Sequence, residues 1–172
     1  GVARDLVALL KSQLNEEKWT RTAINNYTIK NFEDLDALVQ EFSDNHIQKE
    51  ISAITNDYLS KNKNSIIALY ISTIFQLNDG RFEDGSPYSL LKIFSDNLKW
   101  NIVEYIALKI NDSGLKDKHV IRSLLEALTN LGKKDEIETY WEELIKVDYE
   151  EIGIVLKIEE KQMTFRDIPL EI

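Results

Sequence analysis

The segment from Asp117 to Tyr149 constrains the fold of this chain more than any other. Its apolar residues recur at i, i+3, i+4 and i+7 in two runs, which is the spacing of one face of an α-helix. The runs predict a helix from Asp117 to Leu131 and a second from Asp135 to Val147, joined at Gly132, which readily adopts the left-handed conformation that ends a helix. Such a hairpin cannot bury both apolar faces alone and therefore requires a neighbour. The apolar residues are Val120, Ile121, Leu124, Leu125 and Leu128 in the first run, and Ile137, Tyr140, Trp141, Leu144 and Ile145 in the second.

A second copy of the same pattern lies 34 residues earlier in the chain. A 34-residue period with a Leu-Leu step in the first helix, Gly at the turn and an aromatic residue in the second helix resembles the tetratricopeptide (TPR) repeat. The repeat is degenerate, because Ile137 stands where a small residue is usual and Tyr149 where Pro is usual. The aligned residues are Leu90, Leu91 and Phe94 with Leu124, Leu125 and Leu128, and Val103, Ala107 and Ile110 with Ile137, Trp141 and Leu144.

The rest of the chain is also predicted to be helical. The segment Ser65 to Leu77 is apolar nearly all round, which predicts a central helix. Ser86 and Pro87 predict the start of another, with Ser as the N-cap and Pro at the first helical position. Further helices are predicted from Arg4 to Leu14, after Asn15 as a cap with Trp19, Ala23, Ile24 and Tyr27 buried, from Asn31 with Phe32, Leu35, Leu38, Val39 and Phe42 buried, from His46 to Leu59, and from about Asp148 with Ile152, Val155 and Leu156 buried.

No segment alternates between apolar and polar residues over the length of a strand. The predicted fold class is therefore all-α, with antiparallel helical hairpins stacked as a degenerate TPR-like α-solenoid or superhelix. A chain of 172 residues is long enough for one domain with a proper core. We expect one helical-repeat domain over residues 1–162. Residues 163–172 lose the helical period and contain Pro169, so we expect a non-helical tail or the start of a linker to further domains.

The composition indicates the cellular location of the chain and which classes of partner are not expected. The chain has no Cys and a net charge of -9, and residues 135–172 carry four Lys or Arg against twelve Asp or Glu. Phosphate contacts need clustered basic residues, so direct nucleic-acid binding is not expected. No apolar run reaches the length of a membrane span and no signal peptide is visible. We expect a cytoplasmic, monomeric protein without membrane contact.

The sequence contains no legible catalytic, metal or cofactor site. His46 and His119 are far apart and lack the i, i+4 partner of a zinc-binding helix. Gly80 and Gly85 are not followed by the Lys-Ser/Thr of a phosphate-binding loop. The three Trp residues, Trp19, Trp100 and Trp141, fall in register with apolar neighbours, which predicts core packing. We therefore predict no catalytic residue, no metal, no cofactor and no enzymatic activity.

Recognition by shape is the remaining type of site. In a TPR-like stack the first helices of successive hairpins line a concave groove, although neighbouring helices can equally fill it. A Glu, Glu126, stands where the carboxylate clamp of some TPR proteins needs Asn, which argues against binding of a C-terminal carboxylate. By register with the repeat, the predicted partner-binding residues are Tyr88, Lys92, Ser95, Asp96, His119, Arg122, Glu126, Thr129 and Asn130.

Three blocks of sequence together resemble a known family. Residues 14–21 with 26–29, residues 63–72 and residues 94–105 are similar to the long N-terminal helical extension of enlarged bacterial GreA-type transcription elongation factors. The resemblance runs from about Leu14 to Leu156. It implies that the parent protein binds RNA polymerase, and that its Gre portion rescues backtracked complexes by stimulating transcript cleavage. The acidic coiled-coil tip that performs this task in the family matches nothing in this chain.

The resemblance and the residues favour a non-catalytic protein-protein interaction module of a GreA-type factor that acts on RNA polymerase. Two alternatives remain open. In the first, the chain is a stand-alone TPR-like scaffold or spacer. In the second, it is a small-ligand-binding helical protein or an enzyme unrelated to transcription. A pocket of several hundred cubic ångströms with converging polar groups and a perturbed carboxyl group would favour the latter.

Overall fold

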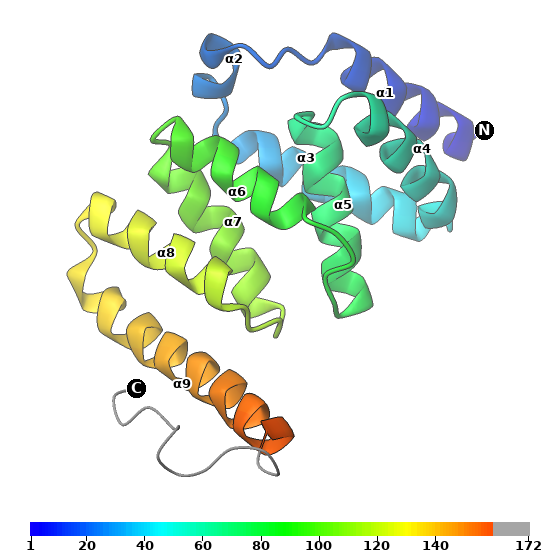
Figure 1. Cartoon of the computed structure of the whole chain (residues 1–172). Coiled ribbons are helices and arrows are strands. Elements are labelled where there is room, and N and C mark those ends of the chain that lie inside the picture. The colour runs from blue at the N-terminus through cyan, green and yellow to red at the C-terminus, as the bar shows by residue number, and fades with distance from the viewer. Residues whose placement is uncertain (160–172) are drawn as a thin grey trace.

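The computed structural model describes the backbone of residues 1–159 and the side chains of residues 1–149. Within those residues the chain forms nine α-helices and no strand, which confirms the all-α class (Figure 1). None of these helices is both long and apolar enough to span a membrane. The helices are α1 (Val2–Glu16), α2 (Arg21–Asn25), α3 (Ile29–Asp44), α4 (Gln48–Lys61), α5 (Ile66–Asp79), α6 (Ser86–Asp96), α7 (Trp100–Asp112), α8 (Lys118–Leu131) and α9 (Lys134–Glu159).

The central helix is α5, as its composition predicted. It packs against α1, α3, α4 and α6, and eight of its residues are buried. Its N-terminus is satisfied twice: the Ser65 hydroxyl accepts the N–H of Ala68, and the Glu17 carboxylate accepts the N–H of Ile67 and the hydroxyl of Ser65. A carboxylate at a helix N-terminus is stabilised by the exposed N–H groups and by the helix dipole. The end of α1 is thereby fastened to the start of α5.

An aromatic cluster joins α3, α5, α6 and α7 at the middle of the molecule. The Phe32 ring is fully buried and its centroid lies 4.9 Å from that of Tyr70, 5.6 Å from that of Phe94 and 6.3 Å from that of Tyr105. The tilted and edge-on arrangements are those that aromatic pairs prefer. The cluster therefore connects the N-terminal helices with the first hairpin of the 34-residue repeat.

From α4 onward each helix contacts the next one along the chain, so the last six helices follow one another in space (Figure 1). The predicted turn at Gly132 is confirmed, since this residue has φ +72° and its N–H bonds back to the carbonyls of Leu128 and Thr129. The aligned first-helix positions of α6 and α8 are all buried, as the 34-residue period predicted. They are Leu90, Leu91, Phe94, Leu124, Leu125 and Leu128.

A further internal similarity, missed in the sequence, links α3 with α6. Both helices end in Phe-Ser-Asp-Asn, at residues 42–45 and 94–97. In both turns the next residue is left-handed: His46 has φ 56° and Leu98 has φ 58°. The Asn side chain bonds back to the carbonyl four residues earlier in each case. Left-handed conformations of residues other than Gly are uncommon, so two such turns after identical tetrapeptides indicate a repeated helix ending.

Several predicted helix starts were wrong. Asn15 does not cap a helix, because α1 continues through Glu16, and the following α2 is a short helix capped by Thr20. The third helix begins at Ile29, two residues before Asn31, whose side chain accepts the N–H of Thr28. Asn15 therefore lies inside a helix, and Asn31 lies in the first turn of α3. Ser86 likewise is the first helical residue of α6, and Gly85 is the cap.

The predicted helix start near Asp148 and the predicted burial of two Trp side chains were also wrong. No helix begins near Asp148, because α9 continues through this residue to Glu159. Trp141 is not in the core: 54 % of it is exposed, and Trp19 is 39 % exposed, whereas Trp100 packs against the core. The side chains of Ile152, Val155 and Leu156, the predicted domain end at residue 162 and the predicted tail at 163–172 lie outside the described residues.

Candidate functional site

A shallow groove of about 430 Å³ lies between α6 and α8, the first helices of the two repeated hairpins. The two helices contact each other directly, so the groove is a hollow along their shared surface. Five of the nine predicted partner-binding residues line it, which places them on one continuous surface. The lining residues are Tyr88, Leu91, Lys92, Ser95, His119, Arg122 and Ser123.

Aromatic rings form one end of the groove. The centroid of Tyr88 lies 5.7 Å from that of His119 and 5.6 Å from that of Phe82, both edge-on. The Tyr88 hydroxyl donates a hydrogen bond to the Asp117 carboxylate, which also caps α8 by accepting the N–H groups of His119 and Val120. Partial burial, and then Asp117, raise the pKa of Tyr88 above its usual value. These contacts hold α6 in a fixed position relative to the start of α8.

Basic side chains form the rim of the groove. Lys92 pairs with Asp96 at 2.8 Å within α6, and Arg122 pairs with Asp148 of α9 at 3.7 Å. All four side chains are partly or largely exposed, and exposed ion pairs contribute about 0 to 1 kcal/mol. A partner carboxylate can therefore replace either acidic residue at little cost. The groove combines the Tyr88 and His119 rings and Leu91 with basic side chains in weak, exposed ion pairs.

The other four predicted residues do not line this groove. Glu126, Thr129 and Asn130 are exposed on the C-terminal half of α8, and Thr129 and Asn130 bond to carbonyls of their own helix. Asp96 lines a smaller hollow of about 180 Å³ beside Trp19 and Asn97. The register placed them on α6 and α8, but the groove extends along only the first half of α8.

A larger cavity of about 990 Å³ lies between α3, α4, α5 and α7 and was missed in the sequence. Asp36 stands in its wall and accepts hydrogen bonds from the hydroxyls of Tyr70 and Tyr105 at 2.6 and 2.9 Å, and from the Lys109 ammonium at 2.8 Å. Partial burial, and then Asp36, raise the pKa of Tyr105 to about 12. These partners are 34, 69 and 73 residues from Asp36 in sequence, so no local motif could have indicated them.

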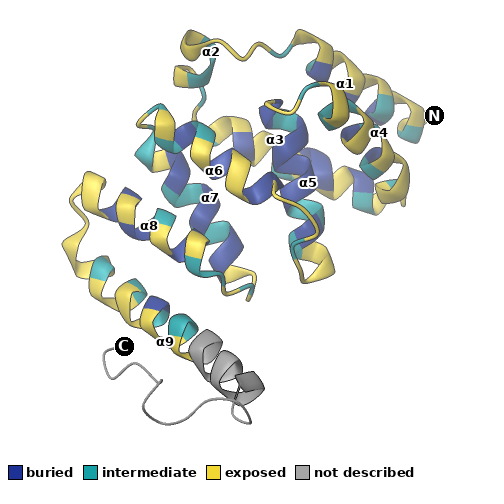
Figure 2. Ribbon diagram, in the orientation of Figure 1, coloured by how far each residue is buried: buried dark blue, intermediate teal, exposed yellow. Residues whose placement is uncertain are grey.

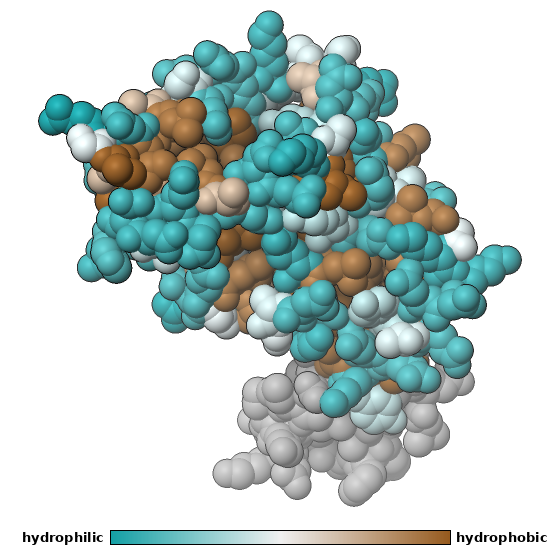
Figure 3. Space-filling view, turned by 180° about the vertical axis from the view of Figure 1, so that it is seen from behind, coloured by the Kyte–Doolittle hydropathy of each residue, from teal (hydrophilic) through white to brown (hydrophobic). Residues whose placement is uncertain are grey.

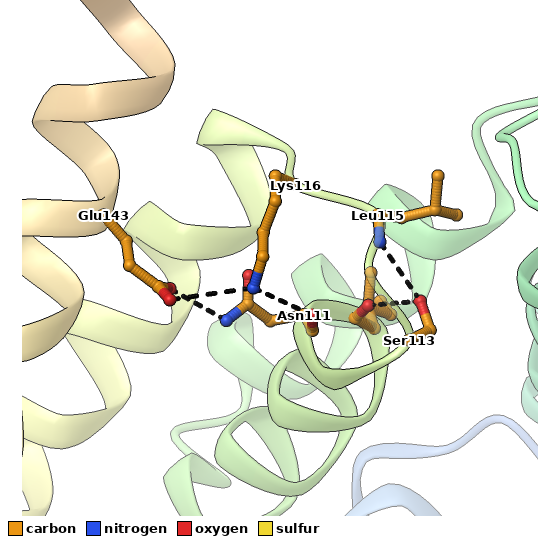
Figure 4. A network of polar contacts seen from close by, with 6 residues as sticks. Asn111, Ser113, Leu115, Lys116 and Glu143 are labelled. Carbon is orange, nitrogen blue, oxygen red and sulfur yellow. Dashed lines mark hydrogen bonds and ion pairs between the residues drawn. The ribbon is translucent and has the colours of Figure 1, made fainter.

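A polar network fixes α9 against the preceding hairpin (Figure 4). The side-chain amide of Asn111, at the end of α7, donates to Glu143 of α9 at 3.0 Å. Lys116, in the loop before α8, has its ammonium 3.6 Å from the same carboxylate. It also donates a hydrogen bond to the backbone carbonyl of Asn111 at 3.1 Å. Buried polar groups of this kind are costly when unpaired, so the network defines one position of α9.

The described part of the chain defines an all-helical protein with a groove between hairpins. No three His, Asp or Glu side chains in that part are grouped as a metal ion requires. Its surface is mixed: the face seen from behind in Figure 3 is largely hydrophilic, with hydrophobic areas between the polar groups. These features are those of an all-helical protein with a groove between two of its helices. Comparison with other proteins indicates to which proteins the chain is related.

Two curated proteins are similar to most of this chain. The GreA-associated domains protein of Treponema pallidum is 34 % identical over 135 residues, which cover 78 % of this chain and 20 % of that protein. The transcription elongation factor GreA of Borreliella burgdorferi is 28 % identical over 151 residues, which cover 87 % of this chain and 16 % of that protein. Both similarities fit an extension of a GreA-type factor, and the predicted resemblance is confirmed.

The chain spans about a fifth or less of the length of these two relatives. The similarity therefore concerns one segment of much longer proteins. No protein-family model and no solved structure matches the chain.

Proposed function

We propose that this chain is a non-catalytic docking module that attaches a GreA-type transcription elongation factor to RNA polymerase. The observation that carries the proposal is the groove between α6 and α8, in a chain similar to segments of two GreA-related proteins. Its aromatic end and basic rim suit a protein segment with an apolar side chain beside an acidic one. The net charge of -9 supports a protein partner over nucleic acid.

The proposal includes a TPR-like arrangement of the helices. In such a stack the first helices of successive hairpins form the binding surface. The α6 and α8 helices hold that position in the 34-residue period, and their aligned apolar residues are buried. The similar endings of α3 and α6 support an earlier unit of the same kind. We propose a monomeric module that works in the cytoplasm.

The test is equilibrium binding of the immobilised chain to purified bacterial RNA polymerase. We expect saturable binding, and we expect Arg122→Glu to weaken it about fivefold to tenfold because like charge then faces an acidic partner segment. The matched control is Lys11→Glu, which makes the same charge change on the exposed face of α1. Equal loss in both variants would assign the effect to net charge and contradict a groove-specific contact.

A transcript-cleavage assay tests the non-catalytic part of the proposal. Backtracked elongation complexes with the chain added should cleave their transcripts no faster than complexes without it. Acceleration by the chain alone would show that it is more than a docking module.

The cavity at Asp36 favours a second candidate function, the binding of a small ligand. A volume of about 990 Å³ is in the range of ligand sites. The Asp36–Lys109 ion pair lies in its wall, and Asp36 also accepts hydrogen bonds from the hydroxyls of Tyr70 and Tyr105. A thermal-shift screen of metabolites distinguishes the two functions. A saturable rise in the melting temperature that Lys109→Met abolishes would favour the ligand-binding function.

A further inference from the structure

The α9 helix carries two apolar faces, and only one of them is covered by described residues. The inner face packs on α8 through Ile137, Tyr140, Leu144 and Val147. The other face, here called the α9 outer face, consists of Trp141, Ile145 and Tyr149, which are 54 %, 46 % and 55 % exposed. A spacing of four residues aligns them in one stripe along the helix. Figure 2 shows most of the described part of α9 in the colour of exposed residues.

The repeat shows what kind of structure covers such a face. On α7, the residues 34 positions earlier than Trp141 and Ile145 are Ala107 and Asn111, and both are buried. They are buried because α7 packs against helices on more than one side, including α8 after it and α6 before it. The same face of α9 has large apolar residues and no helix of the described part against it. By comparison with α7, we expect a helix to cover this face of α9.

The charges around the stripe indicate the chemistry of that helix. From Lys134 to Tyr149, α9 carries two Lys against six Asp or Glu. Glu138 and Glu142 are exposed and lie on the helix surface beside Trp141 and Ile145. A second copy of α9 laid on this face would bring like charges together, which is unfavourable. A helix with Lys or Arg along its flanks would be attracted.

We propose that the α9 outer face is a second docking surface, which binds an amphipathic helix of a partner protein whose apolar stripe is flanked by Lys or Arg. Trp141 is the central contact. Trp and Tyr are the residues that most often dominate the binding free energy of protein interfaces. This surface shares no residue with the groove between α6 and α8.

The test uses a fluorescent peptide and the folded chain. The probe has the sequence of α8, the helix that covers α7, with Glu126→Lys, and therefore three basic residues. The matched control peptide keeps Glu126 and carries Lys118→Glu and Arg122→Glu, which reverses the charge without changing the apolar stripe. We expect the basic peptide to bind with a Kd below about 1 mM and the acidic peptide at least about tenfold more weakly at low salt.

Variants of the chain locate the binding site. Trp141→Ala should weaken binding of the basic peptide at least about tenfold. Leu9→Ala, which removes a similarly exposed apolar side chain on α1, should not change it. The inference is overturned if the basic peptide fails to bind below about 1 mM, if both peptides bind equally, or if Trp141→Ala has no effect. It is also overturned if sedimentation shows that the chain self-associates through Trp141, because the occupant would then be a second copy.

Discussion

The two repeated hairpins show how the same sequence pattern acquires different surroundings. The helices α7 and α9 occupy the same place in the 34-residue period, yet α7 packs against α3, α6 and α8, whereas the described part of α9 packs mainly on α8. Ala107 of α7 is fully buried, and the aligned Trp141 is mostly exposed. Periodicity thus predicts which residues share a helix face, whereas the number of neighbouring helices decides whether that face is buried.

The largest effect should come from truncating an internal position of α7. Ile110→Ala removes a fully buried side chain and should lower the free energy of unfolding by about 2 to 5 kcal/mol, since a cavity forms. Ile145→Ala on the α9 outer face should change it by less than about 0.5 kcal/mol. Urea denaturation measures both. Similar losses in the two variants would remove the distinction between the helices.

Exchanging the aligned residues sharpens the comparison. Ala107→Trp inserts a large ring into a fully buried site and should destabilise the protein by about 1 to 3 kcal/mol or more. The reciprocal Trp141→Ala should change stability by less than about 0.5 kcal/mol. Thermal and urea unfolding of both variants check this expectation. A stability loss of about 3 to 5 kcal/mol for Trp141→Ala would instead indicate a core ring.

The polar link between the hairpins should contribute less. Glu143→Ala removes the partner of the buried Asn111 amide and of Lys116, and should cost about 1 to 3 kcal/mol, mostly from the amide left unpaired. Glu142→Ala, its exposed neighbour, is the control and should be nearly neutral. Hydrogen exchange of α9 should rise only in Glu143→Ala. If α9 stays protected there, Asn111 does not hold it.

The smallest effect concerns pH and the start of the first repeated hairpin. Burial acts to raise the pKa of Asp84, but hydrogen bonds from Ser86 and Gln76 lower it below its usual 3.8. The pKa of Asp84 is lower in the folded chain than in the unfolded chain. The ionised carboxylate therefore stabilises the fold fully above pH 3.8, and this contribution is lost as the pH falls through the folded-state pKa. The melting temperature should therefore fall more steeply in the native chain than in Asp84→Asn as the pH is lowered below 3.8. Parallel curves would show that Asp84 does not contribute.

Local sequence signals predicted much of the fold. The hairpin turn at Gly132, the burial of α5 and the buried residues of α3, α6 and α8 follow from periodicity and helix-ending residues, which depend on neighbours a few positions away. The contact of Glu17 with the start of α5 joins residues 48 and 50 positions apart, and no local pattern encodes it. Asn15 was misread because a good capping residue also occurs inside and after helices.

The candidate site was predictable only in part. The repeat register placed Tyr88, His119 and Arg122 on neighbouring first helices, and the structure brings them together in one groove. It could not show that the groove ends before Glu126, because this depends on how α6 and α8 cross. The Asp36 cavity depends on residues far apart in sequence and leaves no periodic trace. The stripe of the α9 outer face is periodic, but its exposure depends on which helices pack against α9.

The most direct test is the environment of Trp141 in solution. In a variant with Trp19→Phe and Trp100→Phe, Trp141 is the only indole. We predict that its fluorescence emission resembles that of a solvated indole and that acrylamide quenches it efficiently, since this ring lies on the open side of α9. A blue-shifted emission protected from acrylamide would place Trp141 in the core and contradict an α9 face open to a partner.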